Sequence, residues 1–115
     1  MIIGLGIDVT QVSRFTRAAA REGLLERVFT VAERDASMQR MAGRFAAKEA
    51  LAKALGAPSG LVWTDVEVCA DDTGKPYFSC VGTVARRVAE LGIGQLHLSI
   101  THDAGIAAAV VVCEA

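Results

Sequence analysis

The feature that most constrains the fold is a long helical pattern from Met38 to Leu55, which Gly56 and Pro58 bring to an end. Alanine fills much of this segment, and aromatic residues make up only 5% of the chain. The core must therefore be built from small aliphatic side chains at close spacing. Since 115 residues leave room for one such core, we expect residues 1–115 to form a single domain.

Short apolar runs elsewhere in the chain predict strands, and the remaining periodic segments predict helices. The predicted strands are residues 2–9, 62–70, 76–81, 96–101 and 106–112, and the predicted helices are residues 11–21, 38–55 and 83–91. The order strand, helices, strands, helix, strands is typical of an α+β fold. We expect a mostly antiparallel sheet with the helices packed on one of its faces.

Two local patterns add detail to this plan. Gly4 and Gly6 interrupt the first strand, and because glycine weakens a strand, they suggest that another backbone or a ligand approaches closely there. Thr30 and Glu33 have the spacing of a capping box, in which the threonine caps a helix and the glutamate reaches back to it.

The charge of the chain is unevenly distributed. A net charge of −1 argues against general nucleic-acid binding, but basic residues outnumber acidic ones in residues 1–53. Arg14, Arg17 and Arg21 recur three and four residues apart and therefore share one outer helical face. This half of the chain would suit an anionic ligand or an acidic partner, although a simple solvated basic face is the alternative.

The three cysteines indicate a reducing compartment. Cys69, Cys80 and Cys113 are odd in number, lack the spacing of metal ligands and lie in strand-like apolar runs. We expect buried, reduced thiols in a cytoplasmic protein. No apolar run has the length of a membrane span, and the opening residues lack the charged start of a signal peptide.

Two acidic residues stand in unusual surroundings. Projection of the long helix places Glu49 in the middle of a stripe of small apolar residues, where a carboxylate needs a partner for its charge. That partner is either Lys53, one turn later, or a metal ion, and a surface pair of this spacing contributes only about 0.2–0.5 kcal/mol. Asp8 lies at the end of the first strand, as a turn carboxylate or as a metal ligand.

Ser99, Thr101 and His102 follow one another at the end of a predicted strand. Strand alternation puts the two hydroxyls on one face, where they could grip a phosphate together with the histidine and a nearby lysine. The alternative is a turn histidine with capping hydroxyls. Lys75, before Pro76, is a single cation that means little alone, and no phosphate-binding loop or dinucleotide glycine pattern is present.

Taken together, these segments resemble the holo-acyl-carrier-protein synthase family, the small phosphopantetheinyl transferases. Five blocks match in order and span nearly the whole chain: Gly6-Ile7-Asp8 with Arg14-Phe15, Phe29-Thr30 with Glu33, Arg44 to Ala50 with Lys53 to Gly56, Gly74-Lys75-Pro76, and Ser99 to His102. Two departures are Thr73, where the family often has asparagine, and Arg40-Met41, where an aromatic residue is common.

The resemblance implies a homotrimeric, Mg²⁺-dependent enzyme with active sites in the clefts between subunits. It implies transfer of 4′-phosphopantetheine from coenzyme A to a serine of an acyl carrier protein, as in fatty acid biosynthesis, with adenosine 3′,5′-bisphosphate released. Asp8 and Glu49 would hold Mg²⁺, and Lys53 would add a cation. The remaining implied contacts are Arg44, Lys48, Lys75, Ser99 and His102 with the nucleotide, and Arg14, Arg17 and Arg21 with the acidic carrier.

Two other functions fit parts of the pattern. A non-catalytic oligomeric module that binds a nucleotide or an acidic protein would keep the basic helix and need no divalent ion. A different magnesium-dependent transferase acting on a diphosphate would keep the two carboxylates.

Overall fold

Five strands and four α-helices follow one another in the computed structural model, which describes residues 1–115. The chain also contains two 3₁₀ turns: η1 (Ala32–Arg34) lies between α2 and α3, and η2 (Trp63–Asp65) lies between α3 and β2. The strands are β1 (Ile2–Gln11), β2 (Val66–Ala70), β3 (Pro76–Cys80), β4 (Gln95–Asp103) and β5 (Ile106–Glu114). The helices are α1 (Val12–Ala19), α2 (Leu24–Val28), α3 (Met38–Ala54) and α4 (Gly82–Glu90).

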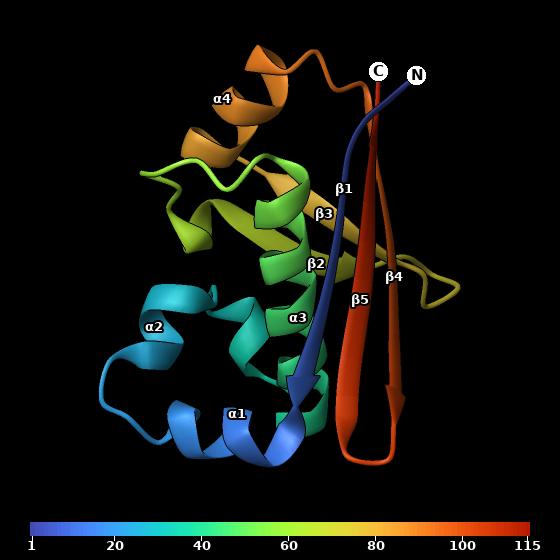
Figure 1. Ribbon diagram of the computed structural model, residues 1–115. Coiled ribbons are helices and arrows are strands. Elements are labelled where there is room, and N and C mark those ends of the chain that lie inside the picture. Colours follow the sequence, from blue (N-terminus) through green and yellow to red (C-terminus); the bar gives the residue numbers. More distant parts are fainter.

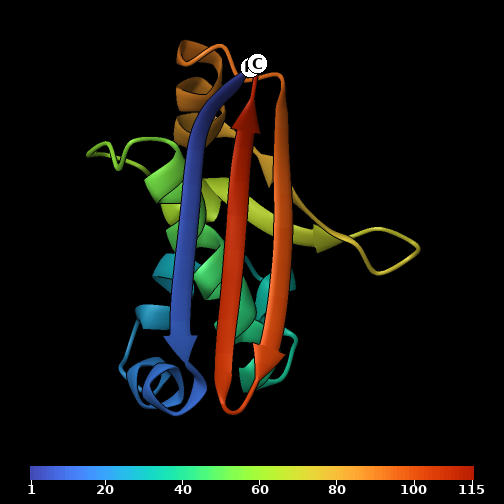
Figure 2. The same cartoon turned by 45° about the vertical axis from the view of Figure 1, so that its right-hand side comes forward.

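The strands form two antiparallel sheets. One sheet has the order β1-β5-β4, and the second is the hairpin of β2 and β3. Helix α3 lies along one face of the larger sheet, with α1 and α2 near one end of the molecule and α4 near the other (Figure 1). The turn between β2 and β3 projects beyond the edge of the sheet formed by β4 (Figure 2). The predicted α+β fold with a mostly antiparallel sheet is thereby confirmed.

The two glycines of β1 allow α3 to lie directly against this strand. A Cβ atom at Gly4 would overlap the backbone carbonyl of Ala54, and one at Gly6 would overlap that of Ala50. The close approach predicted from the sequence is therefore that of a helix backbone, not of a ligand. As a result, Asp8 on the next inward position of β1 is held close to α3.

The core consists of two clusters of mainly small side chains. The larger cluster joins α3 to both sheets and to α4, and the smaller one joins α1, the segment after α2 and the start of α3. Phe15 and Phe29 are the aromatic residues of the smaller cluster, with their rings 5.9 Å apart in an edge-to-face arrangement. The expectation of a core built from small aliphatic groups is confirmed for the larger cluster.

Some predicted elements differ from those observed. The strand expected over residues 62–70 begins only at Val66, because Trp63–Asp65 forms η2. The Thr30–Glu33 capping box is present, with reciprocal hydrogen bonds of 2.9 and 3.4 Å, but it caps the single turn η1. The short helix α2 had no sequence prediction. It begins after Gly23, whose φ of 81° favours glycine.

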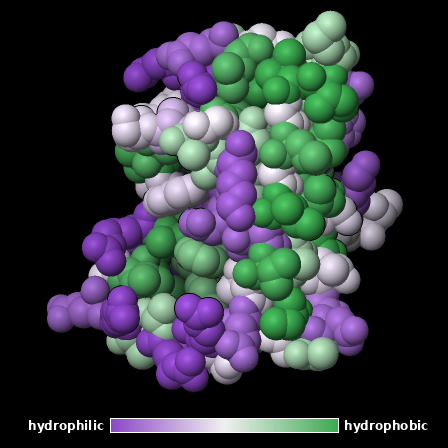
Figure 3. Space-filling model, in the orientation of Figure 1, coloured by the Kyte–Doolittle hydropathy of each residue, from purple (hydrophilic) through white to green (hydrophobic).

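The outer face of β1, at one edge of the larger sheet, is apolar and uncovered. On β1, Leu5, Ile7 and Val9 are each more than 60% exposed. Figure 3 shows this hydrophobic surface along the side of the molecule that β1 occupies, whereas hydrophilic side chains gather around α1 and α2. No helix combines the length and the apolar character needed to cross a membrane.

All three cysteines are free thiols, as predicted, but the predicted burial is confirmed only for Cys113, since Cys69 and Cys80 are half-buried. They lie on β2, β3 and β5, and Cys113 is the most deeply buried. Burial, together with the neighbouring Cys113, raises the pKa of Cys80 to about 11. At neutral pH this thiol therefore stays protonated and unreactive.

Candidate active site

Asp8 lies on the inner face of β1, opposite the helix. Strand alternation turns Gly6, Asp8 and Thr10 toward α3, while their neighbours face outward. The Thr10 hydroxyl donates a 2.9 Å hydrogen bond to Oδ2 of Asp8, and the Asp8 side chain is only 16% exposed. One carboxylate oxygen is thus fixed by the strand itself.

Helix α3 brings Glu49 and Lys53 to the same place. The Lys53 ammonium donates to the carbonyl of Ile7 at 2.8 Å and lies 3.4 Å from Oδ1 of Asp8. Burial raises the pKa of Glu49, the negative charge of Asp8 raises it further, and the Lys53 cation offsets part of the effect. The two carboxylates predicted to converge therefore share one site with one lysine.

A cavity of about 280 Å³ opens beside these groups. Asp8 and Glu49 lie at its polar side, together with Arg14, whereas Phe15 and Phe45 line its apolar side. The chain contains no group of three or more potential metal ligands of the His, Cys, Asp or Glu type. Two carboxylates suit Mg²⁺, which takes few protein ligands and completes its shell with water and substrate phosphates.

The predicted orientation of Glu49 is wrong in one respect. The face of α3 that packs in the larger cluster runs through Ala47, Ala50 and Ala54, so Glu49 lies at its margin and is half-buried. Alanine occurs all round this helix, and the spacing of apolar residues therefore did not distinguish the core face from its edge. The raised pKa of Glu49 nevertheless reflects the unfavourable surroundings that the sequence indicated.

Arg44 and His102 line a second hollow, of about 330 Å³, between α3, the β2–β3 turn and β4. The His102 ring packs on Gly43, and its Nε2 lies 3.0 Å from the carbonyl of Gln39. Lys75 and Ser99 line a different hollow, of about 440 Å³, along the edge of β4. The predicted nucleotide contacts therefore lie in two separate hollows: Arg44 and His102 share one, and Lys75 and Ser99 share the other.

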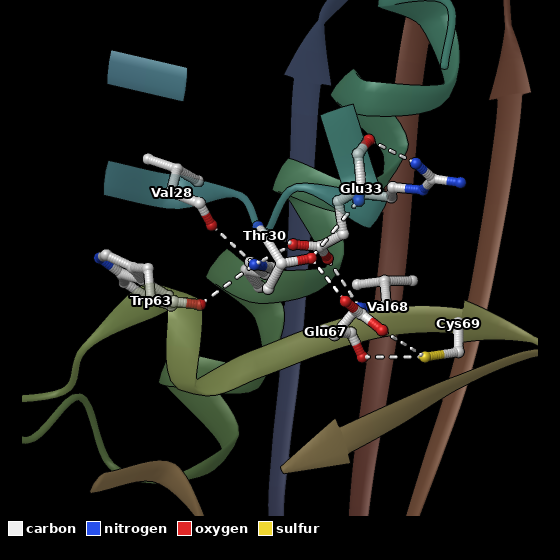
Figure 4. Close-up of polar contacts among 9 residues, drawn as sticks. Val28, Thr30, Glu33, Trp63, Glu67, Val68 and Cys69 are labelled. Carbon is white, nitrogen blue, oxygen red and sulfur yellow. Dashed lines mark hydrogen bonds and ion pairs between the residues drawn. The ribbon is translucent and has the colours of Figure 1, made fainter. Parts of the chain in front are cut away.

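Lys48 does not belong with these contacts, which corrects the prediction. Its side chain is 1% exposed and its ammonium lies 2.7 Å from Oε1 of Glu33. It also donates to the carbonyls of Val28 at 2.6 Å and Trp63 at 3.1 Å (Figure 4). Burial lowers the pKa of Lys48, and Glu33 counteracts that effect. All three ammonium protons are used inside the protein, so none is available to a nucleotide.

The three arginines predicted to share a face are all exposed. Arg14 and Arg17 belong to α1, but the helix ends at Ala19, so the prediction that Arg21 shares their helical face is wrong. Arg14 also lines the cavity that contains Asp8 and Glu49. The basic surface is therefore continuous with the candidate active site.

Comparison with known proteins identifies the family. The family model of the 4′-phosphopantetheinyl transferase superfamily matches residues 4–111. A holo-[acyl-carrier-protein] synthase of Salinispora arenicola is 53% identical over an alignment of 121 positions that covers 99% of each chain. The chain belongs to the 4′-phosphopantetheinyl transferase superfamily.

Solved structures of this family share the fold over the full chain. The holo-[acyl-carrier-protein] synthase from Neisseria meningitidis is similar with a TM-score of 0.88 at 30% identity, covering 100% of both chains. The Helicobacter pylori enzyme, solved in complex with coenzyme A, gives a TM-score of 0.84 at 31% identity, covering 96% of this chain and 99% of that one.

For this transferase, sequence reasoning missed residues that support the site. Thr10 lies two positions after Asp8, and that spacing alone would have placed its hydroxyl on the same face of the strand. Phe15, Phe45 and Leu24 line the apolar side of the first cavity, but nothing in their spacing distinguishes a cavity wall from the core. Glu33 was recognised as a capping residue and not as the partner of Lys48.

Proposed function

We propose that this chain transfers 4′-phosphopantetheine from coenzyme A to a serine of an acyl carrier protein and releases adenosine 3′,5′-bisphosphate. The observation that carries the proposal is the meeting of Asp8 and Glu49 at a cavity with an apolar wall. The relatives that share its full length are named holo-[acyl-carrier-protein] synthases, and solved relatives include complexes with coenzyme A. We expect the enzyme to act in the cytoplasm, in fatty acid biosynthesis.

The residues of the site divide the catalytic work. Asp8 and Glu49 would hold Mg²⁺, which when bound supplies charge neutralisation for the diphosphate. Lys53, anchored at Ile7 and Asp8, adds a fixed positive charge beside the transferring group. Glu49, which lines the cavity beside Asp8, is also the candidate that accepts the proton from serine Oγ.

The nucleotide end of coenzyme A would lie between α3 and the β2–β3 turn. Arg44 and His102 there could contact phosphate groups, and Lys75 and Ser99 lie in the neighbouring hollow. Arginine suits this role because its planar guanidinium can donate two parallel hydrogen bonds to a phosphate.

The apolar outer face of β1 supports a homotrimer with active sites between neighbouring subunits. Leu5, Ile7 and Val9 present large hydrophobic side chains to solvent from one strand. A contiguous exposed apolar surface of this kind is typical of a protein–protein contact. The Ile7 carbonyl, which Lys53 binds, lies on this same strand, so such a contact would adjoin the candidate active site.

The basic surface formed by α1 and the residues just after it is proposed to bind the acidic carrier. Arg14→Glu combined with Arg21→Glu should raise the Michaelis constant for the carrier at least about tenfold and leave that for coenzyme A within twofold, because the exposed charges steer association. Steady-state kinetics with each substrate varied in turn measures both constants. An equal loss for both substrates would count against this docking face.

Mass spectrometry of a carrier protein incubated with coenzyme A tests the proposed reaction. Mg²⁺-dependent addition of one phosphopantetheine group is expected. A different transferase acting on a diphosphate would leave the mass of the carrier unchanged. A non-catalytic binding module would also leave it unchanged, and coenzyme A would stabilise that module against heat whether or not Mg²⁺ is present.

A further inference from the structure

The buried ion pair of Glu33 and Lys48 lies outside the cavities that the proposed function uses. Both side chains are 1% exposed, and Lys48 Nζ lies 2.7 Å from Oε1 of Glu33. An ion pair at this depth adds little net stability over apolar side chains of the same size. Stability alone therefore does not account for it, and the contacts of the pair suggest another role.

Every polar atom of the pair has a partner. Oε1 of Glu33 also accepts from the backbone N–H of Thr30 at 2.9 Å, and Oε2 accepts from that of Val68 at 2.7 Å. The Lys48 ammonium completes its set with the carbonyls of Val28 and Trp63 (Figure 4). The pair thereby joins α3 to the end of α2, to η2 and to β2.

Glu33 also contacts α3 one turn before Lys48, through its backbone carbonyl. Nη1 of Arg44 donates a 2.6 Å hydrogen bond to the backbone carbonyl of Glu33, whose side chain holds Lys48 four residues further on. This is the one hydrogen bond that the Arg44 side chain makes within the chain. Four of the five N–H donors of its guanidinium therefore remain available, at the edge of the hollow that also contains His102.

We propose that Glu33 is a positioning residue for coenzyme A binding. Its carboxylate, fixed by Lys48 and two backbone N–H groups, places the Glu33 carbonyl, and this carbonyl orients the Arg44 guanidinium toward the phosphates of the nucleotide. The inference rests on the proposed function, in which Arg44 contacts those phosphates.

A double-mutant cycle on nucleotide affinity tests this role. The Kd of adenosine 3′,5′-bisphosphate is measured by calorimetry for the wild type, E33Q, R44A and E33Q/R44A, below the unfolding temperature of each. E33Q should weaken binding about tenfold, the loss expected for one hydrogen bond to a charged group. In the R44A background the same substitution should change Kd less than twofold, because the group that Glu33 orients is gone. The Michaelis constant for the carrier should stay within twofold of the wild type.

The control is E26Q, the same substitution at the exposed Glu26–Arg34 pair, which should leave the Kd unchanged. If E33Q does not fold, E33D replaces it in the same cycle, since it keeps the charge but is too short to reach all three donors. The proposal would be overturned if the Glu33 variant bound the nucleotide with the Kd of the wild type. It would also be overturned if the double variant lost affinity by the product of the two single losses. Failure of the wild type itself to bind the nucleotide or to modify a carrier would instead overturn the proposed function.

Discussion

At the scale of single residues, the site is defined by how α3 and β1 surround Glu49 with charge. Asp8 repels its carboxylate, Lys53 attracts it, and partial burial disfavours its ionised form. The protein therefore keeps a carboxyl group where its surroundings disfavour the ionised form. A residue that lowers the stability of the fold in this way is typical of a functional site.

A neutral substitute for Glu49 should stabilise the protein. Because the pKa of Glu49 is raised by folding, the folded state favours the protonated form, and ionisation above this pKa costs stability. E49Q should therefore have a higher Tm than the wild type at pH 7 without divalent ions. The gain should shrink as the pH falls through the raised pKa of Glu49, and it should vanish below the ordinary glutamate pKa of about 4.3, where the folded and unfolded states are both protonated. Calorimetry across this pH range measures the effect.

The exposed Glu90, which pairs with Arg87 at 3.5 Å, offers a matched control. E90Q should change the free energy of unfolding by less than about 0.5 kcal/mol. A Tm of E49Q below that of the wild type at pH 7 would show that Glu49 is stabilised, not strained, in the folded protein. Added Mg²⁺ should raise the Tm of the wild type and not that of E49Q.

At the scale of elements, the packing of β1 on α3 brings the two carboxylates together. Gly6 permits this packing because a Cβ there would overlap the carbonyl of Ala50. G6A should lower the free energy of unfolding by about 3 kcal/mol, at the upper end for overpacking, because helix backbone cannot move aside as a side chain can. It should also lower activity, since β1 carries Asp8. Chemical denaturation and transfer assays measure the two effects.

Gly94 provides the control for this substitution. A Cβ at Gly94 would meet its nearest atom at an ordinary 3.5 Å, so G94A should cost less than about 1 kcal/mol. Equal stability of G6A and G94A would contradict the close packing of β1 on α3.

The sequence predicted the helices and strands better than it predicted which side of a helix is buried. Gly4 and Gly6 predicted the close approach of another backbone or a ligand, and only the structure shows that it is the backbone of α3. The buried side of α3 was not identifiable, because alanine carries no preference strong enough to mark one side of a helix. Lys48 shows the same limit: its burial depends on Glu33 and on carbonyls of Val28 and Trp63, which are distant in sequence. Only the folded chain brings those acceptors together.

At the scale of the whole molecule, the apolar face of β1 is the surface that the proposed trimer would cover. L5E combined with I7E places two carboxylates on this face, where both positions are more than 60% exposed in one subunit. The subunit should stay folded, because these side chains contribute little to its own core. Light scattering should show monomers, and kcat/KM should fall at least about a hundredfold if the sites require two subunits.

Val31 lies elsewhere on the surface and is 76% exposed, so V31E controls for the added charge. V31E should keep the oligomeric state of the wild type. A fully active L5E/I7E monomer would rule out sites shared between subunits.

The most direct test concerns the shared role of Asp8 and Glu49 in the transfer. The rate at which a carrier protein gains one phosphopantetheine group is measured by mass spectrometry for the wild type, D8N and E49Q, with Mg²⁺ or with a chelator. The wild type should react only with Mg²⁺, and each variant should lose at least about a hundredfold in rate, because charge neutralisation at the diphosphate dominates the barrier. A wild-type rate in either variant, or a reaction unaffected by the chelator, would contradict the account.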